Sequence, residues 1–337
     1  MERGDACHQQ LLASRSRGAR AARSGAGRAP RRAWDVTALI AVLLLLAAGI
    51  WFGATADAVA EAAVAGHPVR AALTSPFRRA ALMLSRQAIA TEHPDRLNRL
   101  LAPACYLVLA AAGLSVVPFA PGIAVTDIAT GLVLWGACEA LVVVVVFLNG
   151  WSANAPLPLI GGYRYVAIGL PAMLISMFVL IGAALPAQSL GVGAVVESQR
   201  VLINAVRQPL GLPLFLLLGL SITLRGPFDY GDSADLAGGT HAEASGAHRL
   251  LWRAAKLAML TAFSAMAATV FLGGYLGPVL PGPAWLVLKT ALVMLVLVAI
   301  THLVARVPPG RMLTWLWTVL LPLSFVDLVW AGLEAMR

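Results

Sequence analysis

The sequence is short of charge and of cysteine, and each shortage excludes a class of protein. Only 12% of its 337 residues are charged, whereas a soluble domain carries about 25%. The three cysteines, Cys7, Cys105 and Cys138, lie far apart, which argues against an iron–sulfur cluster, a structural zinc site and a disulfide framework. The sequence also lacks a P-loop, and its glycine-rich candidate at Gly191 and Gly193 has no third glycine and no preceding strand. We therefore expect this chain to bind no redox cofactor or nucleotide itself, so that any such group belongs to a partner.

Apolar residues make up 59% of the chain. At about 20 apolar residues for each transmembrane helix, a chain of this length has room for about seven to nine of them. Eight apolar stretches are separated by segments with proline, glycine or charge, namely residues 36–53, 100–120, 126–148, 165–185, 208–224, 255–276, 284–304 and 312–332. No internal repeat of fixed period is visible, so an inverted-repeat transporter is not indicated. The sequence predicts an all-α, polytopic membrane protein with about eight transmembrane helices over residues 34–337.

The first 33 residues differ in composition from the rest. Residues 1–32 contain eight arginines against two acids, Glu2 and Asp5. This segment has almost no apolar side chain to bury, so we expect a disordered tail over residues 1–33. The apolar run after it is too long for the core of a signal peptide and is followed by more spans, which favours a first membrane helix. A solvated extension beside the lipid bilayer explains the tail better than binding to nucleic acid does.

A different kind of helix is predicted between the first two spans. Ser75 and Pro76 are typical of a helix start, with serine as the N-cap and proline in the first turn. Apolar residues then recur at three- and four-residue spacing at Phe77, Ala81, Leu84 and Ala88, while other faces carry Arg78, Arg79 and Arg86. This segment is too short and too charged to cross a membrane, so we expect one amphipathic helix that lies in the interface.

The basic residues of the loops predict the orientation of the chain. The loops after spans one, three, five and seven contain thirteen lysines and arginines, whereas those after spans two, four and six contain only Arg200 and Arg207. The positive-inside rule places the first set of loops in the cytoplasm of a bacterial cell (inner) membrane and both termini on the outer side. The arginine-rich tail contradicts this orientation. Either a charged tail is translocated, or the chain was translated from a start site upstream of the real one.

The most polar of the expected cytoplasmic loops follows the fifth span. It carries one arginine, four carboxylates and one histidine, at Arg225, Asp229, Asp232, Asp235, His241 and Glu243. Clustered carboxylates shift one another's pKa values and can pass protons or bind a polar headgroup. The alternative interpretation is a solvated loop with no such role.

This loop also carries a family resemblance. Its R-G-P-F-D, with Pro227 and Phe228, and its later A-G-G-T-H-A-E-A-S-G resemble the cytoplasmic loop of the H subunit of bacterial NADH-quinone oxidoreductase, the counterpart of subunit 1 of respiratory complex I. That family reads R-x-P-F-D, then acids, then A-G-x-x-x-E-Y-S-G. Five further segments resemble family motifs in the same order, namely residues 148–154, 161–164, 196–199, 268–274, which includes Gly273 and Gly274, and 285–289. The resemblance covers about residues 75–325.

The resemblance implies a membrane subunit of a proton-translocating oxidoreductase. In that family the subunit joins a hydrophilic arm on the cytoplasmic side, which holds FMN and the iron–sulfur clusters, to antiporter-like membrane subunits. It forms most of the chamber that admits quinone, the substrate, with the interfacial helix at the mouth. By resemblance, the loop residues that face the quinone headgroup end are Arg225, Asp229, Asp232, Asp235 and Glu243, and Arg164 is the start of span four. All six are candidates for the quinone chamber and the proton relay.

The sequence also departs from the family. The family glutamate of span four is replaced by Met173 or a neighbour, and the usual Lys-Glu of the interfacial helix is replaced by Arg86 and Gln87. Glu139 lies near the middle of span three, where an unpaired charge costs several kcal/mol and is a functional candidate. We hypothesise that Glu139 replaces the lost carboxylate. The alternative is a protonated or hydrogen-bonded glutamate in a helix contact.

Other functions stay open at this point. The chain could be the equivalent subunit of a membrane-bound hydrogenase or formate-oxidising complex, or a diverged subunit that anchors a complex without pumping protons. Of the remaining polar residues, we interpret His302 as an interfacial histidine with satisfied hydrogen bonds. Asp327 in span eight is either functional or solvated near a membrane surface.

Overall fold

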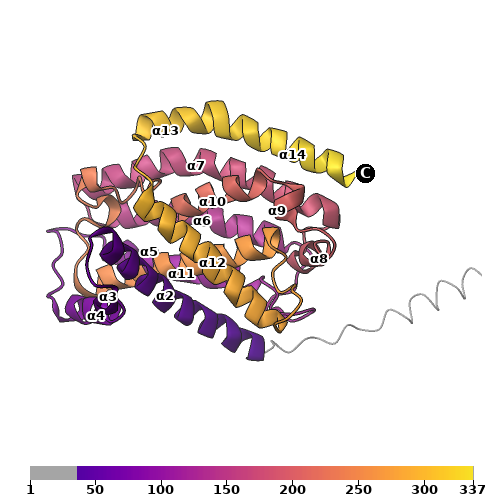
Figure 1. Ribbon diagram of the computed structural model, residues 1–337. Coiled ribbons are helices and arrows are strands. Elements are labelled where there is room, and N and C mark those ends of the chain that lie inside the picture. Colours follow the sequence, from indigo (N-terminus) through magenta and orange to yellow (C-terminus); the bar gives the residue numbers. More distant parts are fainter. Residues whose placement is uncertain (1–35, 337) are drawn as a thin grey trace, which may run out of the picture. The chain divides into compact units, whose positions relative to one another are not determined.

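The computed structural model describes residues 36–336, and the predicted tail at residues 1–33 lies outside this range. Every element in the described range is a helix apart from one isolated β-bridge (Figure 1). Seven helical segments of this range are long and apolar enough to cross a membrane. They are α2 (Val36–Val64), α5 (Arg96–Ser115), α6 (Gly131–Ser152), α7 (Pro156–Ala184), α11 (Gly246–Phe271), α12 (Gly282–Leu303) and the continuous run of α13 (Pro309–Trp315), the π-helical turn η4 (Leu316–Leu320) and α14 (Leu321–Ala335). The prediction of an all-α, polytopic membrane protein is confirmed.

The fifth apolar stretch, residues 208–224, forms a shorter helix, α10 (Gly211–Ile222). Before it, Gln199 donates a hydrogen bond to the carbonyl oxygen of Thr269 near the end of α11. After it, Asp232 accepts one from Lys256 in the first half of α11. The chain therefore crosses between the two ends of α11 through α10. A 12-residue helix rises only about 18 Å, and the irregular backbone on either side is tolerated because it is buried within protein.

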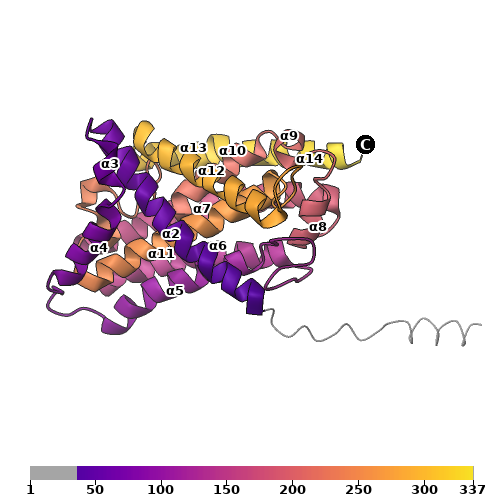
Figure 2. The ribbon, with the colours of Figure 1, turned by 60° about the horizontal axis from the view of Figure 1, so that its bottom comes forward.

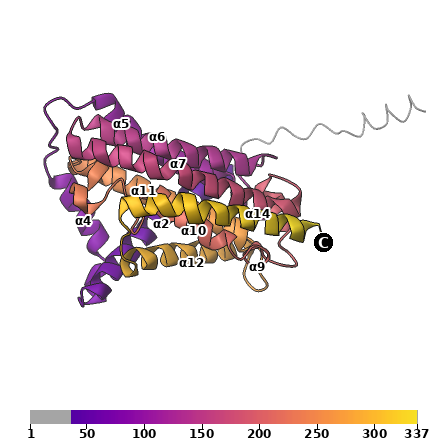
Figure 3. The same cartoon turned by 90° about the horizontal axis from the view of Figure 1, so that it is seen from above.

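Helix α11 lies at the centre of the bundle. It packs against α5 and α12, while α6 packs between α5 and α7, and α14 lies along α7 (Figures 2 and 3). Its aromatic side chains meet those of its neighbours, because the Phe263 ring stacks on Phe215 of α10 at 4.5 Å and lies 6.2 Å from Trp135 of α6. The buried alanines of α11 allow this close approach of helices.

The connecting segments gather at two opposite ends. One end holds α3 (Val69–Ala72), α4 (Ser75–Ser85) and the 223–245 loop with η2 (Ala234–Leu236) and η3 (Gly239–His241). The other holds η1 (Leu185–Ala187), α8 (Val192–Glu197) and α9 (Asn204–Arg207). The first turn of α2 and the end of α14 both point toward this second end, on opposite sides of the bundle (Figure 1).

The predicted interfacial helix is α4, which packs against α11. Its N-cap is Thr74 rather than Ser75, and Pro76 lies in its first turn as expected. The helix ends at Ser85, so the prediction that its apolar repeat continues to Ala88 was wrong. No α4 residue is buried, and Phe77 is 65% exposed. An exposed apolar side is what a helix at a membrane interface requires.

The side chain of Lys289 connects two of the segments that resemble family motifs, residues 268–274 and 285–289. Gly273 and Gly274 have positive φ angles of 74° and 49°, and they turn the chain away from the end of α11. Lys289 Nζ donates to the carbonyl oxygens of Leu272, Gly274 and Leu276 at 2.6, 3.0 and 2.7 Å. The lysine thus satisfies carbonyl groups that a helix end leaves without intrahelical partners.

Candidate functional site

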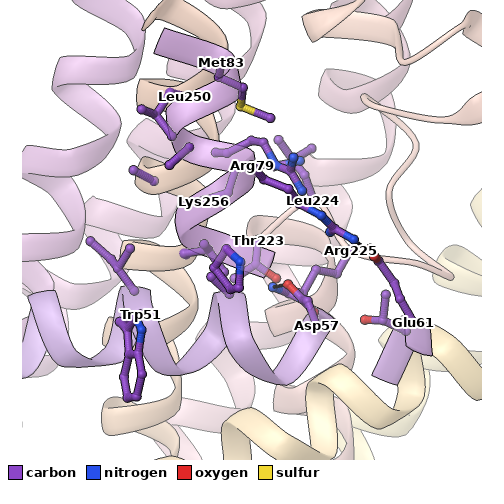
Figure 4. A pocket seen from close by; sticks show the side chains of 18 of the residues that line it. Trp51, Asp57, Glu61, Arg79, Met83, Thr223, Leu224, Arg225, Leu250 and Lys256 are labelled. Carbon is purple, nitrogen blue, oxygen red and sulfur yellow. Dashed lines mark hydrogen bonds and ion pairs between the residues drawn. The ribbon is translucent and has the colours of Figure 1, made fainter. Parts of the chain in front are cut away.

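A cavity of about 430 Å³ lies between α2, α4, α11, α12 and the loop that follows α10 (Figure 4). One part of its wall is apolar, with Ile50, Trp51 and Leu257. The other part carries charged and polar side chains, namely Asp57, Glu61, Arg79, Arg225, Asp229, Lys256 and His302. The cavity therefore combines a slot for an apolar chain with a polar end.

Helix α2 contributes one face to this cavity. Its lining residues include Ala47, Ile50, Ala54, Asp57 and Glu61, which recur every three or four residues. The apolar stretch predicted for this span ended at residue 53, but the helix continues to Val64 because the segment is rich in alanine, the best helix former. Sequence reasoning missed Asp57 for this reason. The unbroken spacing from Ile50 through Asp57 to Glu61 was the signal that could have found it.

Asp57 and Arg225 form a two-pronged ion pair. Arg225 Nη1 and Nη2 donate to Asp57 Oδ1 and Oδ2, both at 2.7 Å (Figure 4). The Arg225 side chain is only 10% exposed, so the pair is largely screened from water. Such charge-assisted, bidentate pairs are among the strongest side-chain contacts. The arginine expected in the site is thus held by an acid from the first membrane helix.

His302 of α12 lies beside this ion pair. Its Nε2 is 3.8 Å from Asp57 Oδ1. That nitrogen is buried and has no hydrogen-bond partner in the described part of the chain. The interpretation of His302 as a histidine with satisfied hydrogen bonds was therefore wrong, and the cavity wall holds an unsatisfied polar atom.

Asp229 and Asp232 are both buried but differ in their partners. Arg306 donates a hydrogen bond to Asp229, which lines the cavity. Asp232 accepts from Lys256 Nζ at 2.8 Å and lies 3.3 Å from His241 Nδ1. Burial raises the pKa of the Asp229 carboxyl, against the opposing effect of Arg306. Burial would also raise the pKa of Asp232, yet Lys256 and His241 hold it well below its usual range. Asp232 is therefore a fixed charge, and Asp229 is the more readily protonated of the two.

The remaining loop residues do not line the cavity. Asp235 is exposed and pairs at 2.7 Å with Arg164, which lies well inside α7 rather than at its start. Hydrogen bonds from Ser233 and Arg164 lower the pKa of Asp235. Glu243 is also exposed, beside a separate small hollow that His248 lines as well.

Close backbone contacts hold the loop in place. A Cβ atom on Gly161 of α7 would lie 2.5 Å from the carbonyl oxygen of Gly231. Asn149 of α6 donates to the carbonyl oxygen of Thr240 at 2.9 Å. Pro227 and Phe228 are also buried, the Phe228 ring lying 6.3 Å from Tyr230. The family-like segments at residues 148–154 and 161–164 therefore dock the polar loop onto α6 and α7.

Glu139 forms a separate polar contact within the bundle. Its carboxylate is 1% exposed and accepts from Trp135 Nε1 at 2.5 Å and from Ser176 Oγ at 2.7 Å. Ser176 belongs to α7, the span that lacks the family glutamate. The carboxylate of Glu139 thus links α6 to α7 through the hydrogen bond from Ser176.

Comparison with known proteins points to one family. Residues 35–332 match the family model described as NADH dehydrogenase. The chain is 34% identical over 240 residues to the NADH-quinone oxidoreductase H subunit 1 of Rhodopseudomonas palustris strain HaA2, an alignment that covers 71% of this chain and 75% of that one. It is 34% identical over 231 residues to the H subunit 2 of Cereibacter sphaeroides strain ATCC 17029, which covers 68% of this chain and 73% of that one. The H subunit of Syntrophotalea carbinolica is 27% identical over 267 residues, 74% of this chain and 81% of its own.

Proposed function

Because this chain belongs to the NADH dehydrogenase family and is a membrane subunit of NADH-quinone oxidoreductase, we propose that its cavity is the chamber that admits quinone. The chain is a non-catalytic subunit on its own, since the oxidoreductase is a complex of several subunits. The observation that carries the proposal is that one cavity connects the exposed amphipathic helix α4 to the Asp57–Arg225 ion pair.

The cavity wall suits the two parts of a quinone. An isoprenoid tail is apolar, and Ile50, Trp51 and Leu257 offer it a matching surface. The headgroup has two carbonyl oxygens, which accept hydrogen bonds from donors such as Arg225 and His302 Nε2. The apolar part of the wall lowers the local dielectric constant, which strengthens those hydrogen bonds.

Reduction of a quinone to a quinol takes up two electrons and two protons. The electrons come from the iron–sulfur clusters and FMN that we assign to partner subunits. Asp229 can hold a proton at the polar end, because burial raises the pKa of its carboxyl. The charge of Asp232 stays fixed by Lys256, and it orients the lysine that also lines the cavity.

We assign the partners and the orientation from the loops. The end with α4 and the 223–245 loop carries most of the basic residues, so it faces the cytoplasm and the hydrophilic arm. The second end, with both ends of the described chain, faces the outer side of the bacterial cell (inner) membrane. Antiporter-like membrane subunits would cover part of the exposed apolar surface, and lipid the rest.

Glu139 is the carboxylate that we propose in place of the missing glutamate of span four. Glu139 lies on α6 and contacts α7, which is span four, through the hydrogen bond that it accepts from Ser176. A carboxyl with two donors inside the bundle can exchange one partner for another when its charge changes. Coupled proton transfer would then depend on Glu139 itself.

The experiment that tests this function is purification of the tagged chain from its native membranes in mild detergent. Co-purification of flavin and iron–sulfur subunits, with an inhibitor-sensitive NADH:quinone activity, is the expected result. Recovery with a nickel–iron subunit would assign the chain to a membrane-bound hydrogenase instead. Recovery with membrane subunits alone, and no activity, would support an anchor that does not pump protons.

A further inference from the structure

A second acid lies inside the bundle, outside the lining of the cavity. Asp327 of α14 is 1% exposed, and α14 lies along α7 (Figures 1 and 3). The alternative interpretation of Asp327 as a solvated aspartate near a membrane surface is therefore wrong. Gln208, which follows α9 and is equally buried, donates from Nε2 to Asp327 Oδ2 and to the carbonyl oxygen of Val179 of α7.

The amide of Gln208 is held between two glycines. A Cβ atom on Gly182 of α7 would lie 2.6 Å from Gln208 Nε2, and one on Gly211 of α10 would lie 2.7 Å from Gln208 Cδ. At both positions a side chain larger than hydrogen would collide with the Gln208 amide. The amide lies where α7, α10 and α14 meet, and its nitrogen faces two acceptors.

This arrangement leaves too few donors. Asp327 Oδ1 and Gln208 Oε1 are both buried without a hydrogen-bond partner in the described part of the chain. Each of these acceptors loses its hydrogen bonds to water on burial and gains none in return, which destabilises the folded chain. An ionised aspartate would add the cost of a charge within the membrane, which the Gln208 amide and the backbone N–H of Gly211 offset only in part. A proton on Asp327 removes the charge and supplies an O–H donor that Gln208 Oε1 can accept.

The surrounding helices bring little charge to this place. Helix α14 packs against α7, α10, η1 and η4, whose charged or titratable side chains are Tyr163, Arg164 and Tyr165. These three lie in the first third of α7, about 21 Å or more along the helix from Val179. Glu334 lies two turns further along α14 itself.

One cation adjoins the pair in the chain. Arg207 precedes Gln208, and its carbonyl oxygen accepts from Trp330 Nε1 of α14 at 3.0 Å. Its Nη1 is buried and has no hydrogen-bond partner among the described residues. Arg207 is thus joined to α14 through its main chain, and no hydrogen bond or ion pair among the described residues joins its guanidinium to Asp327.

The site also adjoins the contact of Glu139. Ser176, the partner of Glu139, and Val179, which Gln208 contacts, are three residues apart on α7. Two buried carboxyls are thus linked to neighbouring positions on one helix, Glu139 of α6 directly and Asp327 of α14 through Gln208.

We propose that Asp327 is a protonated carboxyl in the folded chain and that Asp327 and Glu139 are two proton-holding groups on a route along α7. The protonation of Asp327 follows from its own contacts, whereas its part in proton transfer rests on the proposed function. Gln208 is a positioning residue, because it acts through the hydrogen bond to Asp327.

The test compares the purified complex with its Asp327→Asn variant, which keeps the size and a donor and an acceptor. The infrared spectrum of the wild-type complex minus that of Asp327→Asn should show a carboxylic C=O band. The spectrum of wild type minus that of Glu334→Gln, on the same helix, should show no such band. Proteoliposomes should show a loss of proton-to-electron ratio in Asp327→Asn equal to that in Glu139→Gln.

Each outcome decides one part of the proposal. An unchanged C=O band in Asp327→Asn means an ionised aspartate and overturns the proposal. A lost band with a wild-type ratio overturns the route along α7 and leaves a neutral structural acid. If the wild-type complex itself lacks NADH:quinone activity, the proposed function fails, while the infrared result still decides the protonation of Asp327.

Discussion

Breaking the Asp57–Arg225 ion pair is the perturbation whose consequences the structure defines best. Asp57→Asn leaves the guanidinium of Arg225, whose side chain is 10% exposed, without both of its charge-assisted contacts. Removing one partner of a buried, hydrogen-bonded charge pair costs about 2–5 kcal/mol. We expect about 2–3 kcal/mol, because the Asp57 side chain is 24% exposed and water screens part of the loss.

A double-mutant cycle separates this pair from its surroundings. Arg225→Gln should destabilise the subunit to a similar extent, and the double variant should lose less than the sum of both, with a coupling energy of about 1.5–3 kcal/mol. Thermal unfolding of the subunit in the purified complex measures these differences. The double variant removes both charges and leaves no unpaired cation in the cavity wall.

Quinone kinetics should respond differently from stability. If Arg225 donates to a headgroup oxygen, each variant that lacks it should lose about tenfold or more in kcat/KM for quinone, since about 1.4 kcal/mol corresponds to a factor of ten. The rate with ferricyanide, which takes electrons before quinone does, should stay unchanged. Asp235→Asn is the matched control, because that carboxylate lies outside the cavity. Additive stability losses together with wild-type quinone kinetics in all variants would mean that the two side chains are neither coupled nor in contact with quinone.

Three further predictions follow from single contacts. Glu139→Gln should lower the proton-to-electron ratio of proteoliposomes. Ser176→Ala removes only one of the two donors to Glu139 and should lower the ratio less. Equal ratios in both variants and in wild type would contradict a role for this carboxyl. Because the folded pKa of Asp232 lies below its unfolded value of about 3.9, its stabilisation is complete above that pH and is lost as the pH falls through the folded pKa. Asp232→Asn should therefore lower the Tm at pH 7 and make the Tm depend less on pH under acidic conditions. A Tm with the same dependence on acidic pH as wild type would count against the contact with Lys256. Lys289→Met should cost about 1–3 kcal/mol, because it leaves three carbonyl oxygens without their donor, and a Tm equal to that of wild type would show that water replaces the ammonium group.

Hydrophobic patterning predicts most of this fold, because seven of the eight apolar stretches become long helices. It failed where a helix continues beyond its apolar part. Helix α7 begins at Pro156 and α11 at Gly246, each nine residues before the predicted stretch, because a tyrosine or an arginine interrupts an apolar run without ending a helix. The fifth stretch looked like the others in composition, yet its helix covers only Gly211–Ile222. Composition does not reveal where the backbone of a buried segment becomes irregular.

The candidate site was predictable in part. The loop motif pointed to Arg225 and Asp229, and both line the cavity. Asp57 was missed because the predicted span ended at residue 53, and its pairing with Arg225, 168 residues away in the sequence, has no local signal. Glu139 was singled out by its place in an apolar helix, but its contact with Ser176 depends on how α6 packs on α7. Long-range pairing of this kind follows from packing, which a single sequence does not encode in a readable form.

The proposed function depends above all on quinone occupying the cavity beside α2, α4 and α12. A photoreactive quinone analogue, applied to the purified complex and mapped by mass spectrometry of peptides, would show whether it does. We expect labelling of peptides that contain Trp51 or Asp57 of α2 and His302 of α12, and loss of that labelling with excess unlabelled quinone. Labelling confined to other subunits, or labelling here that excess quinone does not displace, would contradict a quinone chamber at this place.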